Sequence, residues 1–145
     1  MKMVLQLQTE LAVKEAAYDG TLLTSPEHVE AYLSELKSAA QEAFVVIALN
    51  AKNRVIEKHL VSLGTVSSAL VHPREVFRPL IQSGASYTIL AHNHPSGSPS
   101  PSCEDLKITR QLIAAGEIMG IKVLDHIVIG DRAVSLRETG LCHFG

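Results

Sequence analysis

The sequence predicts a single domain of the α/β class, with helices layered on a sheet in an α+β arrangement. The chain has 145 residues, which suits one domain with a substantial core and is a tight fit for two. Hydrophobic residues make up 46% and charged residues 19%, as is ordinary for globular proteins. Patterned segments follow one another as helix, strand hairpin, helix, strand, helix and strand, an order typical of layered domains.

The N-terminal arm, residues 1–24, has an ambiguous pattern. Residues 4–9 alternate partly like a strand, whereas residues 10–18 fit a helix equally well. We therefore leave the structure of the arm open and expect the domain itself to occupy residues 25–145.

A first helix is predicted directly after this arm. Thr24 or Ser25 supplies its cap, and Pro26 suits its first turn. Apolar residues then recur at helical spacing, so we expect the helix to continue to about Ala40.

A strand hairpin and a second helix follow. Residues 44–49 form a short, β-rich apolar run typical of a buried strand, and a turn over residues 50–53 leads to residues 55–63 as its partner. Pro73 suits the first turn of the second helix, whereas Pro79 is expected to make that helix irregular.

The second half of the chain alternates strand and helix. Residues 87–91 read as a strand that ends at two histidines, and a loop of only Pro, Ser and Gly covers residues 95–101. A third helix is expected over residues 103–119, and residues 121–129 follow as a further buried strand.

Charge and cysteine content limit the partners and the compartment. The net charge of −2 and a pI near 6.4 give no general attraction to phosphate, so nucleic acid is not an expected partner. Cys103 and Cys142 form no disulfide framework, which favours a reducing cytoplasm. No apolar run is long enough for export or for a membrane span, so we expect no membrane association.

Three side chains have the chemistry of a metal site. His92 and His94 project to one face at a strand end, with Cα atoms roughly 6.5 Å apart. The loop after them can double back and bring Asp105, in the first turn of the next helix, to the same place. Two imidazoles and one carboxylate leave a position for water on a tetrahedral ion, as in catalytic zinc sites.

These residues also have purely structural explanations. Two histidines separated by one residue occur by chance, and Ser102 with Asp105 is a good capping pair for a helix. On these features alone, metal binding and a structural role are equally open.

A longer pattern changes that balance. It consists of His92-Asn93-His94-Pro95, then six residues, Ser102, two residues and Asp105. This pattern resembles the JAMM motif of JAB/MPN-type metalloproteases. More closely, residues 92–97, 101–102, 104–105 and 124–127 look like the RadC branch of that superfamily. The resemblance covers about Ser25 to Gly140 and implies the cytidine-deaminase-like fold of JAB/MPN proteins.

The resemblance also implies a role for each residue of the site. His92, His94 and Asp105 would be ligands of one Zn²⁺, and Ser102 would stabilise the oxyanion formed on the attacked carbonyl. Glu42 stands where the family has its general acid/base, at the edge of the first core strand. Glu75 and Glu104 are rivals for that role, but both are more simply residues of a first helical turn.

Other polar residues are expected to be structural. Asp125-His126 also resembles a RadC feature, yet a histidine in an apolar strand is more often satisfied in the core or behind a ligand. His72 is expected to cap its helix, and Cys103 to be a buried or partly buried packing residue.

The resemblance favours a zinc-dependent metallohydrolase that cleaves an amide, peptide or isopeptide bond in an unidentified peptide or protein substrate. The alternative is a DNA-repair-associated factor or nuclease of the RadC type without peptidase activity, and an inactive scaffold is a third possibility. The acidic balance and the absence of a helix-hairpin-helix segment before the domain argue against a DNA role, so we expect a catalytic module alone. The sequence does not indicate an oligomeric state.

Overall fold

The computed structural model describes residues 19–64 and 71–145. The two alternatives for residues 4–9 and 10–18 therefore lie outside the described residues. Along the chain the elements are α2 (Pro26–Tyr32), the 3-10 turn η1 (Ser34–Leu36), β1 (Ala43–Leu49), β2 (Val55–Leu63), α3 (Pro73–Gln82), β3 (Tyr87–Asn93), α4 (Cys103–Met119), β4 (Lys122–Ile129) and β5 (Ala133–Ser135).

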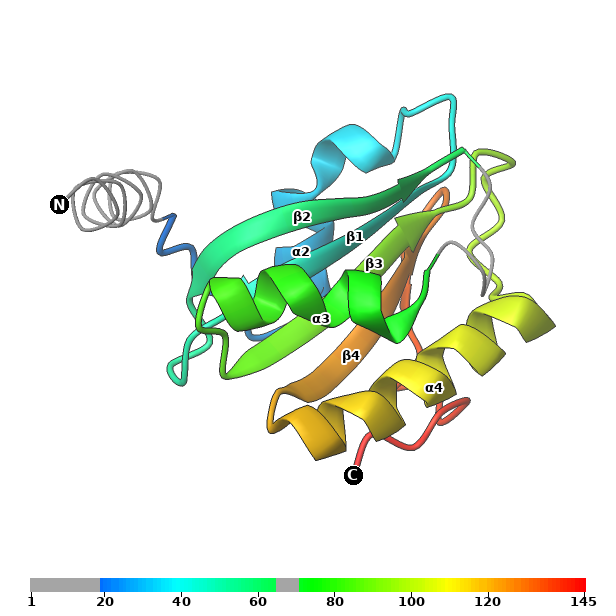
Figure 1. The fold of residues 1–145 in the computed structure, drawn as a ribbon. Coiled ribbons are helices and arrows are strands. Elements are labelled where there is room, and N and C mark those ends of the chain that lie inside the picture. The colour runs from blue at the N-terminus through cyan, green and yellow to red at the C-terminus, as the bar shows by residue number, and fades with distance from the viewer. Residues whose placement is uncertain (1–18, 65–70) are drawn as a thin grey trace, which may run out of the picture.

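The described strands form one mixed sheet in the order β2-β1-β3-β4-β5. β1 pairs antiparallel with both β2 and β3, whereas β3 and β4 are parallel and are joined by the crossover helix α4. Helices α3 and α4 cover one face of the sheet, and α2 lies on the other (Figure 1). The predicted α+β layered fold is confirmed.

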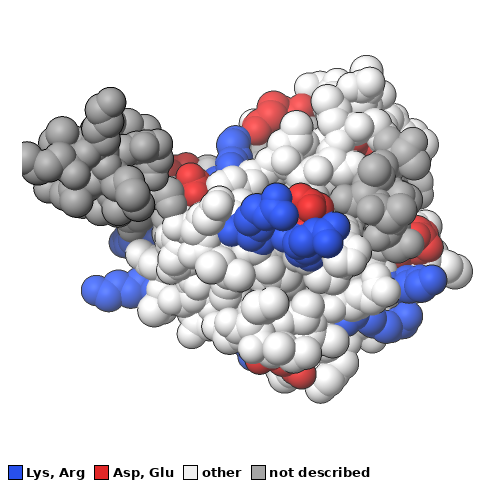
Figure 2. All heavy atoms as spheres, in the orientation of Figure 1, with Lys and Arg blue, Asp and Glu red and all other residues white. Residues whose placement is uncertain are grey.

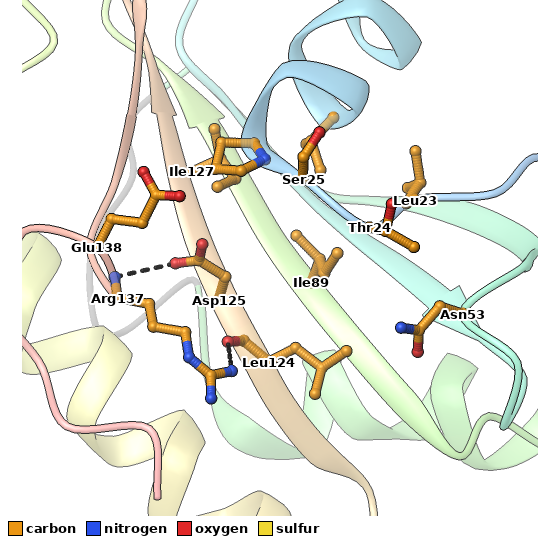
Figure 3. Close-up of a pocket in the computed structure, with 12 residues that line it drawn as sticks. Leu23, Thr24, Ser25, Asn53, Ile89, Leu124, Asp125, Ile127, Arg137 and Glu138 are labelled. Carbon is orange, nitrogen blue, oxygen red and sulfur yellow. Dashed lines mark hydrogen bonds between the residues drawn. The ribbon is translucent and has the colours of Figure 1, made fainter.

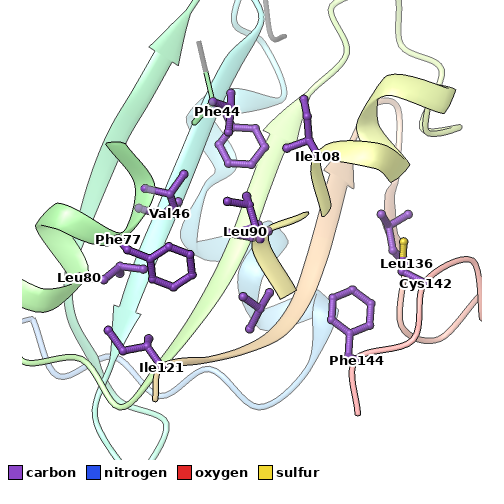
Figure 4. Close-up of a cluster of buried hydrophobic side chains, with 14 of the residues drawn as sticks. Phe44, Val46, Phe77, Leu80, Leu90, Ile108, Ile121, Leu136, Cys142 and Phe144 are labelled. Atoms are coloured by element: carbon purple, nitrogen blue, oxygen red, sulfur yellow. The ribbon is translucent and has the colours of Figure 1, made fainter. Parts of the chain in front are cut away.

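Both faces of the central strands are buried, which explains their continuous apolar sequences. Every residue of β1 is buried, as is every residue of β3 after Tyr87. Figure 4 shows the core on the α3 and α4 side, where Phe44, Leu90 and Ile108 meet between the sheet and the helices. A second cluster on the α2 side contains Leu23, Val29, Leu33, Val45, Ile47, Ile89 and Ile127.

The ends of the helices are set by local chemistry. Ser25 caps α2 by accepting a hydrogen bond from the backbone of His28. His72 caps α3 through Nδ1, as expected, and α3 continues through Pro79 to Gln82.

Two predicted boundaries shift by two residues or more, and one strand was not expected. The α-helix that was expected to reach about Ala40 ends at Tyr32, because Leu33 leaves the helical conformation and a short 3-10 turn leads towards β1. β3 continues past Ala91 to Asn93, since its pairing with β4 extends to Ile129. β5, a three-residue edge strand, was not predicted.

The charged side chains of α3 illustrate how the two signs are mixed on this surface. Glu75 lies 3.3 Å from Arg74 and 3.8 Å from Arg78. In Figure 2, basic and acidic side chains lie next to one another on the face shown. None of the helices in the described segments is long and apolar enough to cross a membrane.

Candidate metal centre

His92 occupies the penultimate position of β3 and points to the α4 side of the sheet. Its ring is fully buried and stacks on Phe44 of the neighbouring strand, with centroids 5.9 Å apart. Nδ1 contacts His126 at 2.7 Å, so Nε2 is the nitrogen that faces the other residues of the site. The strand thus holds one imidazole nitrogen at a defined position.

His94 follows β3 directly and is oriented by the Pro-Ser-Gly loop, residues 95–101. Its backbone N–H donates to the carbonyl of Ile129 at 2.8 Å. Its Nδ1 lies 2.9 Å from the carbonyl oxygen of Ser98, and because a carbonyl only accepts, Nδ1 carries the proton of that bond. A neutral His94 therefore presents an unprotonated Nε2 to the site.

Asp105 is brought to the histidines by the cap of α4. Ser102 Oγ accepts from the backbone N–H of Asp105 at 3.0 Å, and the Asp105 carboxylate accepts from the backbone N–H of Ser102 at 2.8 Å. The capping pair recognised in the sequence is therefore real. It also aims the carboxylate at His92 and His94, at 3.2 Å and 3.1 Å from their Nε2 atoms.

Glu42 stands immediately before β1, where the sequence placed it. Its Oε1 lies 3.9 Å from Nε2 of His92, farther than Asp105, and its side chain is 28% exposed. Asn93 holds the backbone on both sides of Glu42, because its amide accepts from Ala43 N–H at 2.6 Å and donates to the Gln41 carbonyl at 3.0 Å. Glu42 is thus anchored while its carboxylate borders solvent.

The four side chains form a group that fits a divalent cation. Ligand atoms of Glu42, His92, His94 and Asp105 all lie within 4.8 Å of one another. The Nε2 atoms of His92 and His94 are 2.9 Å apart and both face carboxylate oxygens. Lone pairs and anionic oxygens that converge in this way are stabilised by a cation among them, and imidazole with carboxylate is a typical zinc donor set.

Asp105 has the protonation state that such a cation requires. Burial alone would raise the pKa of this carboxyl. The hydrogen bond and charge that a protonated His92 would supply, together with the contacts of Ser102, outweigh burial and hold the Asp105 pKa below its usual range. Asp105 is therefore an anion at neutral pH.

Of two consecutive residues of β4, His126 lies behind this group and Asp125 does not. His126 contacts His92 and is fully buried; burial lowers its pKa well below the ordinary value, and the charge of His92 adds to that effect while Asp105 opposes it. Asp125 points to the opposite face, where burial raises its pKa although Ser135 and Arg137 donate to it. The expectation that His126 is satisfied behind a ligand agrees with this geometry.

Other predicted candidates lie outside the group. Glu75 forms ion pairs with Arg74 and Arg78 on the surface of α3, and Glu104 belongs to the first turn of α4. Cys103 was expected to be buried or partly buried, and that prediction is wrong: it is exposed, because the first turn of α4 directs it to solvent.

Three supporting residues were not found from the sequence. Thr109 contacts His126, and Asn93 anchors the strand edge at Glu42. Gly130 lets the loop lie against the end of β4, because a Cβ there would be 2.4 Å from the Gly97 carbonyl oxygen. Only Asn93, which lies between the histidines, had a position that pointed to the site.

Comparison with known proteins identifies the same region. A family model described as "RadC-like JAB domain" matches residues 23–141. A UPF0758 protein of Caldanaerobacter subterraneus subsp. tengcongensis is 48% identical over 124 residues, which cover 84% of this chain and 53% of that protein. One from Rubrobacter xylanophilus is 47% identical over 121 residues, with 83% and 53% covered.

A third relative, a UPF0758 protein of Desulforamulus reducens, is 45% identical over 143 residues, which cover 97% of this chain and 63% of that protein. The matches thus span between 53% and 63% of the length of these three relatives. Their names state no activity.

Proposed function

The chain belongs to the RadC family of JAB-domain proteins, and on that basis we propose that it is a zinc-dependent metallohydrolase that cleaves an amide, peptide or isopeptide bond. One observation carries the proposal. Nε2 of His92, Nε2 of His94 and the carboxylate of Asp105 converge within 3.2 Å of one another. These three residues would hold the ion.

The chemistry that the ion would supply is activation of water. Zn²⁺ polarises a carbonyl oxygen and lowers the pKa of water towards ~7, which provides hydroxide near neutral pH. Three protein ligands leave a position for water or substrate, and this open position distinguishes catalytic zinc sites from closed structural sites.

Glu42 is proposed to move the proton in this reaction. Its carboxylate lies next to His92 but farther away than Asp105, and it is partly exposed, so it can reach a water molecule or a substrate. A carboxylate in this place can accept a proton from the attacking water and pass it to the leaving amine.

Ser102 is proposed to stabilise the oxyanion. Its hydroxyl accepts a hydrogen bond from Asp105 N–H, and the hydroxyl proton can be donated to a negative charge that develops on the substrate. The side chain is exposed at the start of α4, beside Asp105, where a substrate carbonyl can approach it.

Two measurements on the wild-type protein test the proposal. Elemental analysis after purification in zinc-supplemented buffer should give about one zinc per chain. A peptide and isopeptide library should then contain a substrate whose hydrolysis stops with a chelator and returns with Zn²⁺. A folded protein that stays metal-free, or hydrolysis that a chelator leaves unchanged, would refute it.

The DNA-associated alternative makes a different prediction. Submicromolar binding of duplex or single-stranded oligonucleotides in fluorescence anisotropy, with a steep dependence on salt, would favour it over hydrolysis of a peptide. At a net charge of −2 we expect no tight binding at physiological salt.

A further inference from the structure

A path of buried hydrogen bonds leads from α4 to the back of His92. Thr109 Oγ1 lies 2.7 Å from the backbone carbonyl oxygen of Asp105 and 2.5 Å from Nδ1 of His126. Nε2 of His126 lies 2.7 Å from Nδ1 of His92. The side chains of Thr109, His126 and His92 are all 0% exposed, so bulk water does not compete for these contacts.

The direction of each hydrogen bond follows from the first one. A carbonyl oxygen only accepts, so the single hydroxyl proton of Thr109 is donated to Asp105. The Thr109 oxygen must then accept from His126, which places a proton on Nδ1 of that ring. A fully buried, neutral His126 has its lone pair on Nε2 and accepts from Nδ1 of His92.

We propose that His126 and Thr109 are positioning residues that fix the tautomer of His92, so that the lone pair of its Nε2 faces the metal site. The identity of the ion rests on the proposed function, whereas the hydrogen bonds do not depend on it. The path begins and ends at one residue, because the carbonyl of Asp105 accepts from Thr109 and its carboxylate lies 3.2 Å from Nε2 of His92. Only an unprotonated imidazole nitrogen binds a metal ion.

The opposite direction would prevent metal binding. If Thr109 donated to His126, the proton of His126 would lie on Nε2 and would be donated to Nδ1 of His92. The proton of a neutral His92 would then lie on Nε2, between the ring and Asp105. The two directions therefore differ in which nitrogen of His126 carries the proton.

Long-range ¹H–¹⁵N NMR of metal-free, histidine-labelled wild-type protein distinguishes them. At mildly alkaline pH we expect His126 to have a protonated Nδ1 and an unprotonated Nε2. A proton on Nε2 would overturn the inference. This measurement needs no ion. Failure of the protein to bind zinc would therefore refute the proposed function, and the NMR result would still decide the tautomer of His126.

Substitution of Thr109 tests the consequence for metal affinity. Thr109→Val keeps the branched shape and removes the hydroxyl, whereas Thr109→Ser keeps the hydroxyl and removes a methyl group. Competition with a chromogenic chelator should show Zn²⁺ binding weakened roughly 10- to 100-fold in the valine variant, as is usual when a group that orients a ligand is lost. The serine variant should bind like wild type. An equal loss in both variants, or none in the valine variant, would contradict the role of the hydroxyl.

A second pair tests His126 in the same assay. The amide oxygen of His126→Gln can accept from Nδ1 of His92, and the side chain of His126→Leu cannot. We expect the glutamine variant to bind Zn²⁺ more tightly than the leucine variant. Equal affinities would show that His126 only fills space. Thermal unfolding of all four variants identifies any that have lost the fold, and the wild-type NMR spectrum does not depend on them.

Discussion

Two consecutive residues of β4, Asp125 and His126, point to opposite faces of the sheet and meet different surroundings. His126 lies on the α4 side, behind His92. Asp125 lies on the α2 side, where it lines a cavity of about 330 Å³ (Figure 3). Its carboxylate accepts from the backbone N–H of His126, from that of Arg137 and from the hydroxyl of Ser135.

This difference shows that the cavity and the group of converging ligand atoms lie on opposite faces of the sheet. In the cavity, the buried carboxylate receives three donors from its own chain, and the guanidinium of Arg137 binds the Leu124 carbonyl at 2.9 Å. In the metal-site group, imidazole nitrogens and carboxylates face one another instead. A group of converging acceptors is stabilised by a bound cation. A carboxylate that accepts hydrogen bonds from three donors already has its partners.

The largest expected effect is the loss of metal from the group that contains His92 and His94. Replacement of His92, His94 or Asp105 by alanine should reduce zinc from about one per chain to nearly none, because each removes one of three ligands. Elemental analysis measures this. Replacement of the exposed His143 by alanine is the matched control. Zinc retained by all three site variants would contradict the proposed difference between the two faces of the sheet.

The next effect concerns catalysis without loss of metal. Glu42→Gln keeps size and hydrogen bonding but cannot accept a proton, so hydrolysis should fall on the order of 10²- to 10⁴-fold. Rate and zinc content are measured on the same sample. Glu75→Gln and Glu104→Gln are the controls, and a normal rate for Glu42→Gln beside an inactive control would assign the base to that other glutamate.

A moderate effect is expected at the end of β4 that faces the loop. Gly130→Ala places a Cβ 2.4 Å from the Gly97 carbonyl oxygen and 2.8 Å from Pro99 N, so the loop must move. We expect about 1–3 kcal/mol of lost stability in chemical denaturation, the usual effect of overpacking, together with weaker zinc binding. Weaker binding follows because Ser98, in the same loop, orients His94.

Asp131→Ala on the same turn is the control for Gly130→Ala. It keeps the backbone N–H that donates to the Gly97 carbonyl. Wild-type stability and zinc affinity in Gly130→Ala would show that the loop does not depend on this contact.

The smallest effect is expected on the cavity side. Asp125→Asn weakens the acceptor that Ser135 and Arg137 use, which should lower the free energy of unfolding by about 1 kcal/mol and leave zinc content unchanged. Denaturant unfolding and elemental analysis measure the two quantities. Loss of zinc here would mean that the two faces are coupled through β4.

Much of this site could be predicted because its residues are close in sequence. His92 and His94 are separated by one residue, and Asp105 follows within one loop and one helical turn, where it forms a cap with Ser102. Glu42 is far from them in sequence, and only the resemblance to JAB/MPN proteins pointed to it. Pairing between β1 and β3 brings it beside His92.

The sequence by itself determined the order of helices and strands, the buried character of β1 and β3, and the capped start of α4. These features depend on local patterns of apolar, capping and turn residues. Tertiary structure decided the end of α2, the existence of β5, the exposure of Cys103 and the contact between His92 and His126. These depend on which strands pair and which faces are covered, and contacts between residues 34 positions apart leave no local pattern to read.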